Sequence, residues 1–235
     1  MNNPLIRYTK AFSQSIRERG FLATFHIAIS TLWCILLDNF DEWVYRTNTS
    51  GDVPLESLAI KSANKAYAQP FSSPSQYRLI RKALKKVIKV RDCGFSRSTL
   101  VDFGCGKGRV LIVGSEFGFK KVVGVEFSPE LCREAEANIS AYTARKKKPC
   151  EFQIVNADVT CFEIPPNADV FFFFAFYEYL LDRVVRNILR SRERYPRSIS
   201  AIYVKATYGE IFENHGFRNV GYVTWCGFPT KIYQL

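Results

Sequence analysis

The stretch Val101-Asp102-Phe103-Gly104-Cys105-Gly106-Lys107-Gly108-Arg109-Val110 decides the fold of this chain. It predicts a buried strand, a glycine-rich turn and the first turn of a helix. Glycines at alternate positions allow positive φ angles and leave no side chains where a ligand would lie. In open α/β sheets, such a turn at the carboxyl end of the first parallel strand binds nucleotide-like cofactors. The identity of that cofactor decides the function.

The spacing of the glycines argues against a dinucleotide. The dinucleotide fingerprint is G-x-G-x-x-G, and its third glycine falls on Arg109 when counted from Gly104, or on Leu111 when counted from Gly106. Asp102 also places a carboxylate two residues before the turn, where it would repel a pyrophosphate and attract an ammonium or sulfonium group. S-adenosylmethionine carries both of these cations and no phosphate. A nicotinamide-dependent oxidoreductase is therefore disfavoured.

Two further strand ends carry acids in the same order along the chain. The run 121–128 predicts a second strand that ends at Glu126. This acid lies 22 residues after Gly104 (126 − 104), close to the separation at which an acid binds the ribose hydroxyls of a cofactor. The run 152–159 predicts a third strand that leads into Asp158.

This D-x-G-x-G-x-G pattern, followed by the two acids, resembles the class I S-adenosylmethionine-dependent methyltransferases. The resemblance implies S-adenosylmethionine as the cofactor, with Asp102 on its methionine amino group, Glu126 on its ribose and Asp158 on its adenine amino group. It also implies an α/β, Rossmann-like sheet with an antiparallel last strand, preceded here by an N-terminal helical extension. The expected cofactor-binding residues are Asp102, Gly104, Cys105, Gly106, Gly108, Glu126, Phe127, Asp158 and Val159.

The block from Asp102 to Ser128 resembles a group of bacterial class I methyltransferases. Those carry an upstream segment like G-V-D-T-x-G-x-V-P-L, which residues 46–55 match in part. The chain is more faintly similar to the histone-lysine methyltransferases that lack a SET domain. Residues 67–75 correspond to their loop before the glycine motif, and 172–176 to their fourth-strand motif. The similarity covers roughly residues 45–235 and is more specific for the cofactor than for the acceptor.

The fourth predicted strand carries the candidate catalytic residues. It runs from Asp169 through four phenylalanines and delivers Phe176, Tyr177 and Glu178 to the catalytic edge. Amine methyltransferases usually place an Asn or Asp there, and this chain has no such Asn. Phe176 and Tyr177 would then wall an acceptor pocket, while Glu178 would accept a proton or hold a cationic acceptor. Alternatively, the phenylalanines are sheet core and Tyr177 begins the next helix.

The 235 residues suit one α/β domain with an extension. We expect a helical extension over 1–45, a loop segment and a basic amphipathic helix over 46–98, and the methyltransferase domain over 99–235. A helix over 208–214, then two strands between 217 and 233, would close the sheet.

Seven cysteines without a C-x-x-C pair, and only two histidines, disfavour a zinc site. Because no secretory cleavage pattern is recognisable, we expect reduced thiols and a cytoplasmic location. Cys105 is expected to fill space within the glycine turn and not to act as a nucleophile.

The net charge of +11 calls for an explanation. Basic residues concentrate in 78–91, 145–148 and 183–197, either as solvated helix faces or as contacts for an anionic acceptor, nucleic acid or membrane. Nucleic acid is disfavoured because no nucleic-acid-binding module is recognisable. Residues 21–37 form an uncharged run of 17 residues (37 − 21 + 1), which would span a membrane, lie on one or dock on the domain. Residues 1–40 are thus a candidate contact with an anionic membrane surface.

These features predict an S-adenosylmethionine-dependent methyltransferase acting on a nitrogen or oxygen of a protein or small-molecule acceptor. The missing fourth-strand Asn motivates an alternative, a catalytically degenerate protein that binds the cofactor or acts as a scaffold. Turnover separates the two hypotheses.

Overall fold

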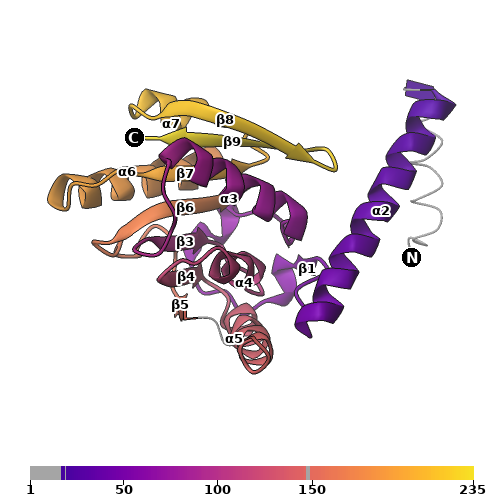
Figure 1. The fold of residues 1–235 in the computed structure, drawn as a ribbon, viewed down its shortest axis with the longest axis horizontal. Helices are drawn as coiled ribbons and strands as arrows, with labels where there is room; N and C mark the ends of the chain where they lie inside the picture. The colour runs from indigo at the N-terminus through magenta and orange to yellow at the C-terminus, as the bar shows by residue number, and fades with distance from the viewer. Residues whose placement is uncertain (1–16, 19, 147–148) are drawn as a thin grey trace.

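A seven-stranded sheet organises the chain in the computed structural model, which describes residues 17–18, 20–146 and 149–235 (Figure 1). The strands lie in the order β5 (Glu151–Asn156), β4 (Lys121–Glu126), β3 (Thr99–Phe103), β6 (Ala168–Phe174), β7 (Ser200–Val204), β9 (Phe228–Gln234) and β8 (Arg218–Trp225). The pairs from β5 to β7 are parallel, whereas β9 is antiparallel to both of its neighbours, β7 and β8. The predicted sheet with an antiparallel end is confirmed.

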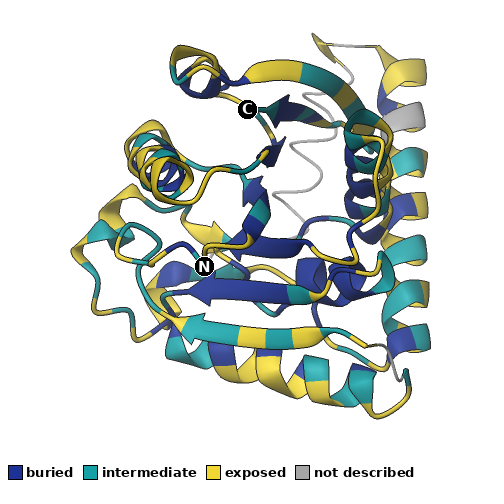
Figure 2. Ribbon diagram, turned by 60° about the vertical axis from the view of Figure 1, so that its left-hand side comes forward, coloured by how far each residue is buried: buried dark blue, intermediate teal, exposed yellow. Residues whose placement is uncertain are grey.

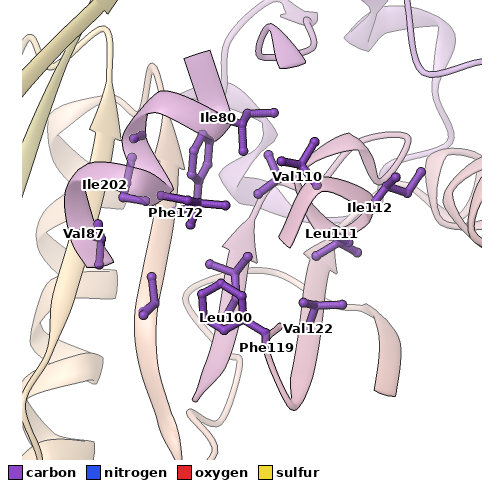
Figure 3. Close-up of a cluster of buried hydrophobic side chains, with 14 of the residues drawn as sticks. Ile80, Val87, Leu100, Val110, Leu111, Ile112, Phe119, Val122, Phe172 and Ile202 are labelled. Atoms are coloured by element: carbon purple, nitrogen blue, oxygen red, sulfur yellow. The ribbon is translucent and has the colours of Figure 1, made fainter. Parts of the chain in front are cut away.

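Helices cover both faces of this sheet. They are α3 (Tyr77–Arg91), α4 (Arg109–Glu116) and α5 (Pro129–Thr143) on one face, and α6 (Glu178–Arg194) and α7 (Glu210–Asn214) on the other. Successive strand residues point to opposite faces, so Leu100 and Phe172 pack beneath α3 and α4 (Figure 3). Val101 and Phe171 pack beneath α6. The central strands are buried on both faces (Figure 2), as their continuous apolar runs require.

Local signals set the helix starts that frame the sheet edge. The Ser128 hydroxyl accepts a hydrogen bond from the Leu131 amide at 3.2 Å, and Pro129 occupies the first turn of α5. Helix α4 begins directly after Gly108, which has a φ of +85°. Tyr177 is the N-cap residue of α6, which begins at Glu178.

The segment between the N-terminal helix and α3 forms more structure than the predicted loop. Helix α2 (Phe21–Tyr45) stands at the side of the sheet (Figure 1), and the part of the predicted extension in residues 1–16 lies outside the described residues. After α2, strand β1 (Val53–Pro54) pairs with β2 (Phe71–Ser72). Between them lie two short 3-10 helices, η1 (Leu55–Ser57) and η2 (Ala63–Tyr67).

One expectation about the cysteines is wrong. Cys34 on α2 and Cys226 at the turn between β8 and β9 form a disulfide across 192 residues of sequence. Sequence spacing held no signal for this pair, because the fold alone brings the turn to the inner face of α2. Cys93, Cys105, Cys132, Cys150 and Cys161 are free thiols.

Candidate cofactor and acceptor site

The glycine turn between β3 and α4 is folded against the neighbouring strand β4. Gly104, Gly106 and Gly108 have φ angles of 72°, 50° and 85°, a region that favours glycine. The Gly104 amide donates to the Val125 carbonyl at 2.8 Å. The backbone of the turn therefore approaches the strand ends closely and leaves a cleft open above them.

The three glycines of the turn lie in different surroundings. Gly104 and Gly106 line the cleft, whereas Gly108 does not. A Cβ on Gly108 would lie 3.2 Å from the Cβ of Ala135, so this glycine allows the start of α4 to approach α5. The structure thus brings two of the three predicted glycines, Gly104 and Gly106, to the lining of the cleft.

Cys105 also lines the inner part of the cleft, where it fills space. A Cβ on Gly124 would lie only 2.6 Å from the Cys105 sulfur, so the thiol occupies the room that the missing side chain leaves. Burial raises the pKa of this thiol well above its ordinary value, with smaller contributions from Glu126 and Asp102. A thiol held protonated in this way is a poor nucleophile.

Glu126 ends β4 at the floor of the cleft and is 3% exposed. Its carboxylate accepts hydrogen bonds from the Gly106 and Ser128 amides, each at 3.0 Å. Burial raises its pKa, and these amide bonds oppose the rise. Glu126 therefore holds the glycine turn in place while it faces the cleft, the position expected for a ribose-binding acid.

Asp102 lies deeper, near the end of β3, and lines the inner part of the cleft. Its side chain is buried, and none of the described residues donates a hydrogen bond to it. Burial and the nearby charge of Glu126 raise its pKa well above the ordinary value. A buried carboxyl without a donor fits a ligand cation, and the methionine ammonium of S-adenosylmethionine is such a cation.

Three of the predicted cofactor-binding residues, Phe127, Asp158 and Val159, line the cleft beyond Glu126. The Asp158 carboxylate, however, accepts bonds from the Ser62 hydroxyl, the Asn64 amide (2.9 Å) and the Thr160 amide (2.8 Å). Burial raises its pKa, but these hydrogen bonds outweigh burial and leave it below the ordinary value. Asp158 thus ties the segment around η2 to the cleft, and its bond to adenine stays a prediction.

Aromatic side chains line the part of the cleft next to the end of β6. This part is lined by Tyr67, Phe71, Phe174, Phe176 and Tyr177, together with the backbone of Ala175. Ala175 has a φ of 51°, which is unusual for a residue with a side chain, and its carbonyl accepts a bond from the Gln69 amide at 2.5 Å. The Tyr203 hydroxyl donates to the Phe176 carbonyl at 2.9 Å and holds this turn from below.

The two predicted catalytic residues lie in different places. Tyr177 lines the cleft and is 39% exposed. Glu178 faces a neighbouring surface groove lined by Tyr179, Asp182 and Arg183, among others, and does not line the cleft. The roles of both residues stay predictions.

An ion-pair network behind the glycine turn was not anticipated from the sequence. The Arg109 guanidinium is 3% exposed and bonds to Asp38 at 2.8 Å and to Glu42 at 3.2 Å, both on α2. It also donates to the Thr49 hydroxyl at 2.7 Å and lies 4.3 Å from the centre of the Tyr77 ring. Only a mismatch to the dinucleotide fingerprint singled out Arg109, because its partners are more than 30 residues away in sequence.

Parts of the chain match known methyltransferases in sequence. Residues 100–195 match a family model described as "Methyltransferase domain". Over 68 residues the chain is 41% identical to a protein-lysine N-methyltransferase from Saccharolobus islandicus (strain REY15A). The matched stretch covers 28% of this chain and only 38% of the length of that relative.

The fold of the sheet is also found in a solved structure. A putative methylase from Haemophilus influenzae superposes with a TM-score of 0.51 at 14% identity, and the match covers 67% of this chain and 97% of the other. An RNA methyltransferase from Salinibacter ruber, in complex with S-adenosyl-L-homocysteine, superposes with a TM-score of 0.49 at 17% identity, over 68% of this chain and 92% of the other.

Proposed function

We propose that this chain, which contains a class I S-adenosylmethionine-dependent methyltransferase domain, transfers a methyl group to a lysine amine of a protein acceptor. The observation that carries the proposal is a pair of adjoining pockets that share Gly104 and Phe174 in their lining. Asp102 lines one of them, and Glu126 lines the other together with the aromatic rings. The identity to a protein-lysine N-methyltransferase supports the choice of acceptor.

The residues of the cofactor end fit the proposed ligand. Asp102 would hold the ammonium group, and Glu126 would receive the ribose hydroxyls. S-adenosylmethionine, when bound, supplies a methyl group on a sulfonium that is already a good leaving group. The protein therefore has to orient the reacting atoms and exclude water, and needs no catalytic histidine.

The acceptor end suits the side chain of lysine. Its rings would pack along the apolar stem, as aromatic surfaces do with long basic side chains. The Ala175 carbonyl would accept an N–H of the amine, in the place where it now accepts the Gln69 amide. Because an apolar wall disfavours the charged ammonium, the lysine would enter as the neutral amine, and we expect the methylation rate to rise with pH.

The experiment that tests this function follows the methyl group to its acceptor. Purified protein is incubated with S-adenosylmethionine labelled on the methyl group and with a protein extract, and the labelled product is hydrolysed to amino acids. We expect the label in methyl-lysine, and much less of it with Asp102→Asn as the matched control when S-adenosylmethionine is kept below saturation. Label in nucleic acid, in base-labile esters or in methyl-arginine would contradict the proposed acceptor.

Tyr177 offers a test of the acceptor end. Tyr177 lines the cleft, and Tyr177→Phe removes only its hydroxyl. We therefore expect unchanged binding of S-adenosylhomocysteine and a turnover that is lower by about tenfold. Calorimetry and the labelling assay measure the two effects separately. Full activity of the variant would assign the Tyr177 ring to packing alone.

The degenerate binding or scaffolding protein remains the alternative. It shares the cofactor end of the cleft and predicts binding of S-adenosylmethionine without methyl transfer to any acceptor class. The labelling assay, run beside a binding measurement, separates the two functions.

A further inference from the structure

Helix α2 presents an apolar face that nothing in the described part of the chain covers. Leu22, Phe25, Ile29, Leu32 and Leu36 recur at three- and four-residue spacing, and Trp43 follows Leu36 after seven residues, about two turns. This spacing places all six on one side of the helix. Each of these side chains is at least half exposed, from 50% for Phe25 to 82% for Leu22. A continuous exposed apolar surface of this kind marks an interaction site.

The opposite face of α2 is docked on the domain. The three acids of the helix, Asp38, Asp41 and Glu42, pair with Arg81 and Arg109, and Cys34 is joined to Cys226. The orientation of the helix is therefore set, and its outer face points away from the domain.

This docking does not suit a helix that crosses a membrane, although α2 is long and apolar enough to do so. The Cys226 sulfur lies 4.0 Å from the Ser30 carbonyl oxygen, so only residues 21–29 of α2 precede the contact with the domain. Nine helical residues span about 14 Å, less than half of the roughly 30 Å of a hydrocarbon core.

The charges around α2 favour a lipid surface over a second copy of the chain. Arg17 lies before the helix, and Arg46 and Arg145 lie at its other end, where the Arg145 guanidinium is 3.5 Å from the Val44 carbonyl. Pairing of two copies, parallel or antiparallel, would bring these cations together. An anionic surface would instead attract them, and the net charge of +11 adds to that attraction.

We propose that the outer face of α2 lies in the plane of an anionic lipid bilayer and attaches the domain to it. The apolar side chains would enter the boundary between headgroups and acyl chains, as in other interfacial helices. The cations at the two ends of the helix would contact the headgroups.

Vesicle sedimentation tests the attachment. We expect the full chain to sediment with vesicles of phosphatidylcholine and phosphatidylglycerol, less in high salt and much less with phosphatidylcholine alone. The double variant Leu32→Gln, Leu36→Gln should lose this binding. Tyr222→Gln, which changes a 59% exposed side chain on β8, should retain it.

Other results of these measurements would contradict attachment to an anionic bilayer. Binding that survives the double variant, or that is equal on neutral vesicles, would overturn the proposal. A dimer in light scattering that the double variant dissociates, without vesicle binding by the wild type, would assign the face to a second copy. Thermal unfolding of both variants verifies that they fold.

Fluorescence quenching distinguishes a helix in the plane from one that spans. In variants that retain one α2 tryptophan at a time, shallow lipid-attached quenchers should reach Trp33 and Trp43 to the same extent. A Trp33 that only deep quenchers reach, with Trp43 at the interface, would contradict the in-plane position.

Discussion

At the scale of single residues, the two buried acids of the cleft differ in what neutralises them. Glu126 has two backbone amides as partners, whereas Asp102 has no donor among the described residues. A buried carboxyl without a partner destabilises the protein that contains it. Such a loss of folding stability is expected at a binding site, where a ligand supplies the missing hydrogen-bond partner.

Asp102→Asn should therefore stabilise the cofactor-free protein while it weakens cofactor binding. The raised pKa of Asp102 means that the cofactor-free protein loses stability as pH rises from the carboxyl's unfolded pKa through its folded pKa. Because the amide of the Asn variant does not ionise, this pH-dependent loss of stability is absent. We therefore expect the variant to have a higher melting temperature than the wild type at neutral pH. We also expect binding of S-adenosylhomocysteine to weaken by about 1–3 kcal/mol, through loss of a charge-assisted hydrogen bond.

Thermal unfolding across pH and titration calorimetry measure the two effects of Asp102→Asn. A variant that melts below the wild type at neutral pH, or that binds S-adenosylhomocysteine equally well, would refute the role assigned to Asp102.

Glu126→Ala should weaken cofactor binding by about 1–3 kcal/mol, because a charged hydrogen-bond acceptor is lost and the Gly106 and Ser128 amides lose their partner. Calorimetry with S-adenosylhomocysteine measures this. Glu134→Ala, which removes an acid paired with Lys107 on the surface, is the control. Unchanged affinity in Glu126→Ala would exclude the ribose role.

At the scale of elements, β4 and the glycine turn are packed too closely for any side chain at Gly124. An added Cβ would lie 2.6 Å from the Cys105 sulfur and 2.8 Å from the Leu111 Cδ1. We expect Gly124→Ala to destabilise the fold by about 1–3 kcal/mol, as overpacking does. Gly94→Ala is the matched control, because its Cβ would meet nothing within 4 Å. Equal denaturant midpoints for the two variants would disprove this packing.

The docking of α2 depends on Arg109. Arg109→Met would leave Asp38 and Glu42 without their shared cation, so we expect a loss of about 3–5 kcal/mol, as for a broken buried ion pair. Chemical denaturation measures the loss, and limited proteolysis should show earlier cleavage near α2. Arg46→Met, at an exposed position, should change neither. Wild-type stability in Arg109→Met would mean that α2 docks by other contacts.

At the scale of the whole molecule, local signals predicted the sheet and the glycine turn at its edge. The apolar runs, the glycine spacing and the acids at 102 and 126 are encoded within short stretches, so the strands and the turn were found from them. Other contacts join residues far apart in sequence. They are the ion pairs of Arg109, the hydrogen bonds from the segment around η2 to Asp158, and the disulfide between Cys34 and Cys226. No local pattern carries such pairings, because tertiary packing creates them.

The fold also separates two residues that the sequence analysis treated together as acceptor-side candidates. Tyr177 and Glu178 are neighbours in sequence, yet the start of α6 places only Tyr177 in the cleft.

The hydrophobicity of residues 21–37 left three arrangements open for this segment: spanning a membrane, lying on one, or docking on the domain. The ion pairs at the C-terminal end of α2 show that the helix is docked on one face and exposed on the other.

The central claim is that the cleft binds S-adenosylmethionine through Asp102 and the glycine turn. The most direct test is calorimetric titration of the purified full chain with S-adenosylmethionine, S-adenosylhomocysteine and NADH. The account predicts micromolar binding of the first two, weakened by Asp102→Asn, and no binding of NADH. Binding of NADH, or no binding of either sulfur compound by the wild type, would contradict it.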